Sequence, residues 1–156
     1  MKVRMVKKIL EANDRIAEDN RRTLGRAGVT TINLMSAPGA GKTTLLGKTI
    51  TELNGSVRFG VIEGDIQGTH DADVIAALHV PVVQINTDGA CHLDANMVFE
   101  AMQDLPLGEL DLLVIENVGN LVCPAEFDVG EDAKVMLLSV TEGDDKPLKY
   151  PLMFQK

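Results

Sequence analysis

One glycine-rich segment constrains the fold of this chain more than any other feature of its sequence. The segment is SAPGAGKTT, residues 36–44; an apolar run at 29–36 precedes it, and a helical pattern from Lys42 to Leu53 follows it. A strand, a glycine-rich turn and a helix in this order are the context of a P-loop, which cradles phosphate groups. Ser36 stands where the first glycine of that motif usually lies, and this change removes none of the groups that touch phosphate. The sequence therefore predicts a nucleotide-binding loop.

The residue types of this loop favour phosphate binding. The alternative interpretation is a flexible glycine-rich turn that contains a lysine by chance. Gly39 and Gly41 let the backbone approach phosphate closely, and the N–H groups that follow point into the concavity. Lys42 is placed to reach the β- and γ-phosphates, and Thr43 to ligate Mg²⁺ through its hydroxyl. The predicted nucleotide-binding residues are Gly39, Ala40, Gly41, Lys42, Thr43, Thr44 and Gly119.

Apolar segments and helical patterns alternate along the whole chain. The predicted strands are 29–36, 57–63, 80–86, 110–117 and 134–140. The predicted helices are 3–24, 42–53, 71–78 and 93–105. In the first helix, which Gly25 and Gly28 are expected to end, the apolar residues at helical spacing are Val3, Val6, Ile9, Leu10, Ile16 and Leu24. This alternation indicates an α/β fold of the P-loop NTPase class, a mostly parallel sheet with helices on both faces. The length of 156 residues favours a single domain over 1–156.

Composition excludes several other classes of protein. The net charge of −8 argues against a general nucleic-acid-binding surface, which needs clustered Lys and Arg. There is no apolar run long enough for a transmembrane helix, and the N-terminus does not read as a signal peptide. Two widely separated cysteines make no disulfide framework. We expect a cytoplasmic protein that binds neither nucleic acid nor membrane.

Two acidic residues near the ends of predicted strands are candidates for a magnesium site. Asp65 lies in EGDIQ, and Glu116 ends the run LLVIE, which has the form of a Walker B element. Gly119 is expected to offer its backbone N–H to the γ-phosphate and to mark a switch. Glu63 competes with Asp65, and each carboxylate is alternatively a solvated group at a strand end. We predict Thr43, Asp65 and Glu116 as magnesium ligands and Lys42, Asp65 and Glu116 as catalytic residues.

Two thiols and an imidazole follow other strands of the same sheet. Cys91 and His92 lie in DGACHLDA after the third predicted strand, and Cys123 lies in NLVCP after the fourth. These donors suit Zn²⁺ and also Ni²⁺, and a two-fold dimer could complete the ligand set. The alternative is a pair of semi-buried cysteines beside a surface histidine. His70 and His79 have no such context, and we expect them on the surface.

Longer blocks of sequence carry a resemblance to a known family. They are SAPGAGKTTLL, VIEGDIQ, VPVVQIN, GACHLDA, IENVGNLVCPAEFDVGE and SVTEGDDKPLKYP. Together they resemble the HypB family, GTPases that assist nickel delivery during [NiFe]-hydrogenase maturation. The resemblance implies Mg²⁺-dependent hydrolysis of the β–γ phosphoanhydride of GTP, a homodimer that associates with nucleotide, and other hydrogenase maturation factors as partners. It also implies a Zn²⁺ or Ni²⁺ site at the dimer interface, built by Cys91, His92 and Cys123. Because Cys123 lies on the loop of Glu116 and Gly119, we expect metal affinity to depend on the nucleotide.

The chain departs from the family pattern at both ends. It starts at the first helix, without the Cys-rich or His-rich segment of some members, and we expect no nickel storage by such a tail. It contains no Asn-Lys pair, so the Asn-Lys-x-Asp guanine-recognition motif is absent. We therefore expect a truncation at the C-terminus, with an exposed sheet edge and apolar surface. An alternative function is a metal-binding interaction protein without nucleotide turnover. A small-molecule kinase ranks lower, because no Arg-rich lid is visible.

Overall fold

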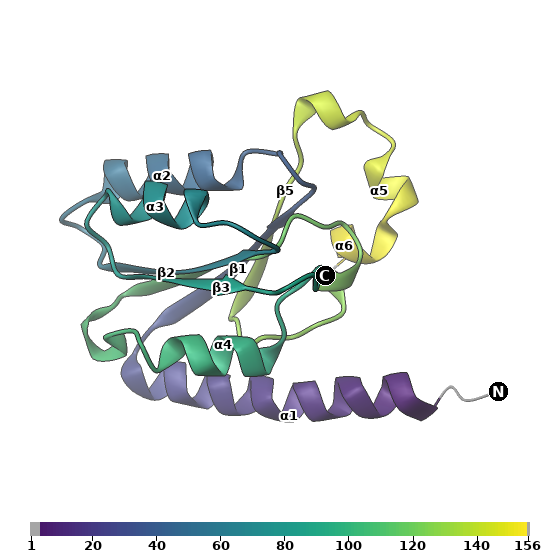
Figure 1. Ribbon diagram of the computed structural model, residues 1–156, viewed down its shortest axis with the longest axis horizontal. Coiled ribbons are helices and arrows are strands. Elements are labelled where there is room, and N and C mark those ends of the chain that lie inside the picture. The colour runs from purple at the N-terminus through teal and green to yellow at the C-terminus, as the bar shows by residue number, and fades with distance from the viewer. Residues whose placement is uncertain (1–3, 156) are drawn as a thin grey trace.

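A parallel sheet forms the centre of the structure, a computed structural model that describes residues 4–155 (Figure 1). Its five strands lie in the order β3-β2-β4-β1-β5, and every pairing between neighbours is parallel. The strands are β1 (Thr30–Ser36), β2 (Phe59–Asp65), β3 (Val82–Asn86), β4 (Leu112–Glu116) and β5 (Ala133–Leu137). The predicted α/β fold class is confirmed, and each strand overlaps the segment predicted for it.

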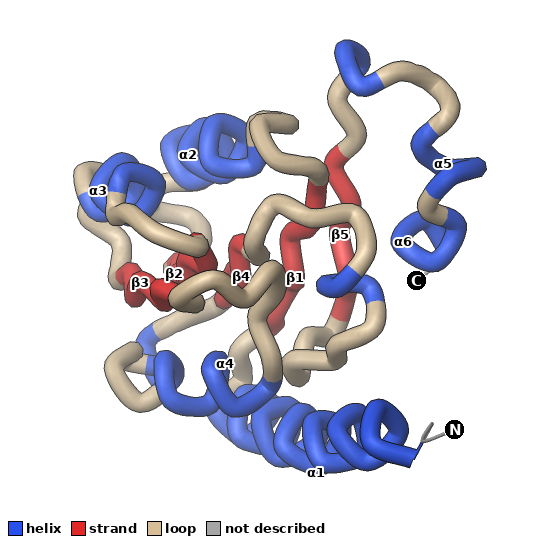
Figure 2. Tube along the Cα trace, turned by 45° about the vertical axis from the view of Figure 1, so that its right-hand side comes forward, coloured by secondary structure: helices blue, strands red, loops and turns tan. Residues whose placement is uncertain are grey.

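Helices cover both faces of this sheet. Figures 1 and 2 show α2 and α3 on one face and α1 and α4 on the other, while the short α5 and α6 lie beyond β5. The helices are α1 (Arg4–Ala27), α2 (Lys42–Leu53), α3 (His70–Ala76), α4 (Ala95–Met102), α5 (Lys146–Lys149) and α6 (Pro151–Gln155). The sequence did not predict α5 and α6, each of which has five residues or fewer.

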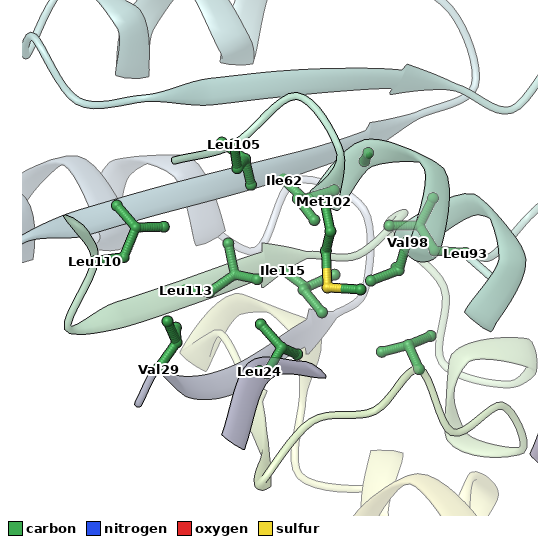
Figure 3. Close-up of a cluster of buried hydrophobic side chains, with 12 residues drawn as sticks. Leu24, Val29, Ile62, Leu93, Val98, Met102, Leu105, Leu110, Leu113 and Ile115 are labelled. Atoms are coloured by element: carbon green, nitrogen blue, oxygen red, sulfur yellow. The ribbon is translucent and has the colours of Figure 1, made fainter. Parts of the chain in front are cut away.

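The two faces of the sheet bury side chains from the same strands. In β4, Val114 packs with the α2 and α3 side, whereas Leu113 and Ile115 pack with the α1 and α4 side (Figure 3). Val61 and Ile62 of β2 divide in the same way. Successive strand residues point to opposite faces. A sheet that is covered on both faces therefore needs apolar residues at consecutive positions, which explains the continuous apolar runs in the sequence.

Helix α1 differs from its prediction in both its end and its buried face. Gly25 lies inside the helix, and the chain turns at Gly28, whose φ is +73°. The buried stripe contains two asparagines and is Asn13, Ala17, Asn20 and Leu24. Ile9, which we expected on the apolar face, is 55% exposed. Val3 and the side chain of Val6 lie outside the described part of the chain. Leu24 is buried and Leu10 and Ile16 are partly buried, so the apolar pattern fits the contact face except at Ile9, but it did not predict the two asparagines.

The strand order brings two particular loops together. β1 pairs with β4 so that Leu34 lies opposite Glu116, and the carboxyl ends of both strands reach the same edge of the sheet. The loop 36–44 leaves β1 at this edge, and the loop that begins at Asn117 leaves β4 there. In parallel sheets, ligands bind beyond the carboxyl ends of the strands. This edge is therefore the place to look for a functional site.

Strand β5 forms one end of the sheet, and apolar side chains after it are exposed. Val140 is 98% exposed and Leu148 is 86% exposed. No helix within residues 4–155 combines the length and the apolar character that crossing a membrane requires.

Candidate functional site

The loop between β1 and α2 has the backbone conformation of a phosphate cradle. Gly39 and Gly41 have φ values of +72° and +100°. These values lie in the left-handed region, which residues with a side chain rarely adopt. Gly41 also caps the start of α2, so the unpaired N–H groups of the first helical turn face the loop. A hollow of about 280 Å³ opens here, lined by Gly39, Gly41, Lys42, Thr43, Thr44, Asp71 and Glu116.

Ser36 has a specific contact that a glycine could not make. The Lys42 ammonium donates a hydrogen bond to Ser36 Oγ at 3.1 Å, and Ser36 Oγ donates in turn to the carbonyl of Ala37 at 2.7 Å. Lys42 is only 9% exposed, so its charge is held beneath the loop. The departure from the glycine of the P-loop pattern therefore orients the lysine within the cradle.

Two buried carboxylates face the same region. Thr43 Oγ1 donates to Glu116 Oε1 at 2.7 Å, and Glu116 is 3% exposed. Glu63, at 2% exposed, lies beside it. Burial, and then the charge of Glu116, raise the pKa of Glu63 to about 9. Burial also raises the pKa of Glu116.

These carboxylates fit a hard cation. Among the described residues, Glu63 Oε1 and Glu116 Oε2 are buried side-chain oxygens without a hydrogen-bond partner. Buried anionic oxygens are costly unless they are paired with a positive charge. Carboxylate and hydroxyl oxygens are the ligands that Mg²⁺ takes in phosphate-binding proteins. Glu63, Glu116 and the Thr43 hydroxyl therefore offer a donor set that matches Mg²⁺.

Two aspartates compete for a place in this site. Asp65 ends β2, and its Oδ1 accepts the N–H of Ile66 at 2.7 Å. Within residues 4–155, Asp65 is not among the side chains that line the hollow, whereas Asp71 at the start of α3 is. In the sequence, Asp71 is the first residue of the helix predicted at 71–78, and the pattern alone gave it no role in the site. Its position after β2, on the ligand-binding edge, was the signal available to find it.

The loop that follows β4 packs directly on the phosphate loop. A Cβ at Gly119 would lie 2.8 Å from Pro38 Cα, a distance that leaves no room for a side chain. The N–H of Asn120 donates to the carbonyl of Ser36 at 2.9 Å. The residue predicted to sense the γ-phosphate thus touches the predicted phosphate loop.

The structure brings Cys91, His92 and Cys123 together. The two Sγ atoms lie 3.0 Å apart, and Cys91 Sγ lies 3.8 Å from His92 Nδ1. One donor atom from each residue lies within 4.8 Å of the others, and all three residues are half-buried. The His92 ring stacks on Phe127 with a centroid distance of 4.0 Å. His70 and His79 are exposed, as predicted.

The donor atoms of this cluster suit a soft or borderline metal, although the metal must displace a thiol proton. Its hydrogen bond to Cys91, and then burial, raise the pKa of the Cys123 thiol to about 11. Burial lowers the pKa of His92, which favours the neutral imidazole. A metal ion would take the place of the thiol protons, because only thiolate sulfur and neutral imidazole nitrogen coordinate. Two sulfurs and one nitrogen suit Zn²⁺ or Ni²⁺ and leave a fourth position open.

The fold and the geometry define a parallel-sheet P-loop nucleotide-binding domain that carries a thiol–imidazole cluster beside its phosphate loop. Residues 30–147 match the family model described as the CobW/HypB/UreG nucleotide-binding domain. The chain therefore belongs to the CobW/HypB/UreG family.

Relatives within this family include hydrogenase maturation factors HypB. The chain is 54% identical to HypB of Escherichia coli K12 over 146 residues, 94% of this chain and 50% of the relative. It is 55% identical to HypB of Azotobacter chroococcum over 152 residues, 97% of this chain and 50% of the relative. The chain thus spans about half the length of these curated relatives.

Solved structures agree with this assignment. HypB from Helicobacter pylori, solved in complex with nickel, matches with a TM-score of 0.88 and 44% identity, covering 92% of this chain and 67% of that one. HypB from Archaeoglobus fulgidus matches with a TM-score of 0.85 and 41% identity, covering 93% and 70%. The resemblance to HypB and the predicted P-loop NTPase fold are confirmed.

Proposed function

We propose that this chain binds and hydrolyses GTP with Mg²⁺ and couples that reaction to nickel delivery during [NiFe]-hydrogenase maturation. One observation carries the proposal: the phosphate loop and the thiol–imidazole cluster lie at one edge of the sheet, and a single loop after β4 contacts both. That loop packs on Pro38 at Gly119 and supplies Cys123 four residues later. The similarity to HypB over nearly the whole chain supports the same conclusion.

The nucleotide part of the proposal assigns roles to the phosphate-loop residues. The backbone N–H groups from Gly39 to Thr44 and that of Gly119 bind phosphate oxygens, and Lys42 binds the β- and γ-phosphates. Thr43, Glu116 and Asp65 would hold Mg²⁺, with Glu63 as the competitor of Asp65, and the ion would neutralise the charge that develops on the phosphates. Lys42, Asp65 and Glu116 are the proposed catalytic residues. The burial of Lys42 beside two carboxylates supports a site organised around a cation and a polyphosphate.

The metal part of the proposal assigns Cys91, His92 and Cys123 to Zn²⁺ or Ni²⁺. Three donors leave the ligand set incomplete, so a second copy of the chain at a two-fold interface completes it. The homodimer, the partnership with other maturation factors and the cytoplasmic location belong to this same proposal. Nickel is the cargo of the protein here, and the γ-phosphate moves the loop of Glu116 and Gly119 to change the affinity for it.

Phosphate release tests the nucleotide part. With Mg²⁺ and GTP, we expect slow release of inorganic phosphate that Lys42→Ala reduces by about a hundredfold or more, because one preorganised cation on the transferring phosphoryl group contributes that much. Lys48→Ala is the matched control, since Lys48 is an exposed lysine on the same helix whose partner is Glu52. Nickel binding without any phosphate release would favour the alternative, a metal-binding interaction protein.

A further inference from the structure

We propose that Asn117 is the positioning residue that couples the phosphate-sensing loop to the metal-binding loop. This inference rests on the proposed function, because it names the physical link through which nucleotide state changes metal affinity. Asn117 follows Glu116 directly and lies two residues before Gly119. Its side chain is 1% exposed and lies between the two sites.

The amide oxygen of Asn117 joins two loops that are far apart in sequence. Asn117 Oδ1 accepts the N–H of Leu93 at 3.2 Å and the N–H of Val118 at 2.9 Å. Leu93 directly follows His92, one of the proposed metal donors, and Val118 directly precedes Gly119. The same oxygen atom therefore holds the backbone of both loops, and a shift of one loop disturbs the hydrogen bond to the other.

The amide nitrogen fixes the orientation of that oxygen. Asn117 Nδ2 donates to Asn33 Oδ1 at 3.1 Å, and Asn33 Nδ2 donates to Glu131 Oε1 at 3.3 Å. Asn33, Asn117 and Glu131 are all buried. The backbone N–H of Asn117 also donates to the carbonyl of Leu34 in β1 at 2.9 Å. The side chain is thus fixed to the sheet by its nitrogen, while its oxygen accepts hydrogen bonds from the two loops.

A second asparagine ties the other metal donor to the phosphate loop. The N–H of Asn120 donates to the carbonyl of Ser36, and Asn120 Oδ1 accepts the N–H groups of Val122 at 2.7 Å and Cys123 at 3.2 Å. The segment 117–120 therefore holds the backbone at both metal-binding segments through side-chain oxygens and touches the phosphate loop through Gly119 and Asn120.

The chemistry at position 117 requires an amide. Its oxygen has two lone pairs for the two N–H groups, and its nitrogen supplies the donor that faces Asn33. Aspartate would keep the two accepted hydrogen bonds but would place a buried charge against Asn33 Oδ1. Alanine would leave both loop N–H groups without this acceptor. We therefore expect Asn117→Ala to remove the coupling between the two loops.

Nickel affinity in two nucleotide states tests the proposal. The full chain would be titrated with Ni²⁺ alone, first with Mg²⁺·GDP and then with a Mg²⁺ complex of a non-hydrolysable GTP analogue. We expect the wild-type affinities to differ by about tenfold, a common size for coupling between two sites. In Asn117→Ala we expect the ratio of the two nickel affinities to fall close to one. The nickel affinity in the GDP state should stay within about threefold of wild type.

Asn20→Ala is the matched control. Asn20 is a buried asparagine that donates to two backbone carbonyls, and its side chain contacts neither the phosphate loop nor the loop 117–120 in the described structure. We expect this variant to lose stability but to keep the wild-type ratio of nickel affinities. Loss of the ratio in both variants would mean that destabilisation alone explains it, which would overturn the role of Asn117.

Hydrogen exchange of the wild-type chain provides a measurement that does not depend on a variant folding. Replacing Mg²⁺·GDP with the GTP analogue should change the exchange rates of the Leu93 and Val118 amides together, because they share one acceptor. A change at Val118 without any change at Leu93 would overturn the proposal.

The outcomes separate this inference from the proposed function. A wild-type ratio of one would refute nucleotide-dependent nickel affinity and, with it, the role of Asn117. A clear wild-type ratio that Asn117→Ala leaves intact would refute only Asn117 as the link. Absence of nucleotide binding by the wild-type chain would refute the GTPase proposal itself.

Discussion

At the scale of single residues, the candidate site holds several ionisable groups close together in a buried position. Glu63 and Glu116 are almost fully buried beside one another; the Lys42 ammonium offsets their charge, and the Thr43 hydroxyl donates a hydrogen bond to Glu116. Burial raises the pKa of both carboxyl groups, and the charge of Glu116 raises the pKa of Glu63 further. A divalent cation would stabilise the ionised form of both. The site therefore favours a bound Mg²⁺ through its electrostatics as well as its geometry.

The role of Asp65 can be separated from that of Asp71 by substitution. We expect Asp65→Ala to slow phosphate release by about a hundredfold while changing GDP binding far less, because a carboxylate on the metal acts mainly on the charge that develops in hydrolysis. Asp71→Ala is the comparison, since Asp71 lines the hollow. Single-turnover phosphate release and fluorescent GDP binding would measure both effects. Normal turnover in Asp65→Ala with a loss in Asp71→Ala would transfer the proposed role to Asp71.

At the scale of elements, α1 is held on the molecule by buried hydrogen bonds as well as apolar contacts. Asn20 donates to the carbonyls of Ala95 and Val129 at 2.8 and 3.1 Å, and Asn13 Oδ1 accepts the N–H of Ala95 at 2.8 Å. These contacts attach α1 to the start of α4 and to the segment before β5. They therefore hold α1 against the face of the sheet opposite α2.

The contribution of these hydrogen bonds to stability can be measured. We expect Asn20→Ala to lower the free energy of unfolding by about 1–3 kcal/mol, because it removes two buried hydrogen bonds to the backbone carbonyls of Ala95 and Val129. Asn96→Ala is the control: Asn96 is an exposed asparagine on α4, and its loss should change stability by about 0.5 kcal/mol or less. Urea unfolding followed by circular dichroism would compare them. Equal stability of Asn20→Ala and wild type would show that the two Asn20 hydrogen bonds contribute no net stability.

At the scale of the whole molecule, strand order explains why the phosphate loop and the thiol–imidazole cluster lie at the same edge of the sheet. The chain places β4 between β1 and β2, so the loops after β1 and β4 lie side by side although more than seventy residues separate them. The loop after β3 reaches the same edge and carries Cys91 and His92. A parallel sheet collects every strand-to-helix loop at one edge, and the order of its strands decides which loops become neighbours.

Base selectivity is a property of the whole chain and can be tested directly. We expect this 156-residue chain to bind a fluorescent GDP analogue with Mg²⁺, because the phosphate loop, Thr43 and Glu116 are correctly placed for it. Competition with unlabelled GTP and ATP would follow. Displacement by GTP alone would show a guanine-selective pocket within this chain. Equal displacement by ATP would show phosphate binding without base selectivity, and failure to bind the analogue would contradict the nucleotide assignment.

The sequence by itself determined the fold class and the phosphate loop, and it indicated which residues are candidate metal donors. These features depend on local patterns: apolar periodicity, a glycine-rich turn between strand and helix, and strand ends that must share one edge of a parallel sheet. The spacing of Cys91, His92 and Cys123 could not show that the three meet, but their common position after strands predicted it. The loop after β4 was recognised in the same way.

Only the tertiary structure decided which polar groups meet in the interior. Nothing local in the sequence distinguishes Asn20 or Asn117 from a surface asparagine, yet both are buried and hold backbone groups from distant segments. The place of Asp71 in the hollow and the pairing of Glu63 with Glu116 depend on how β2, β4 and α3 pack. Hydrogen bonds between distant segments form only after the sheet is assembled. For that reason the network around Asn117 could not be predicted from the order of residues.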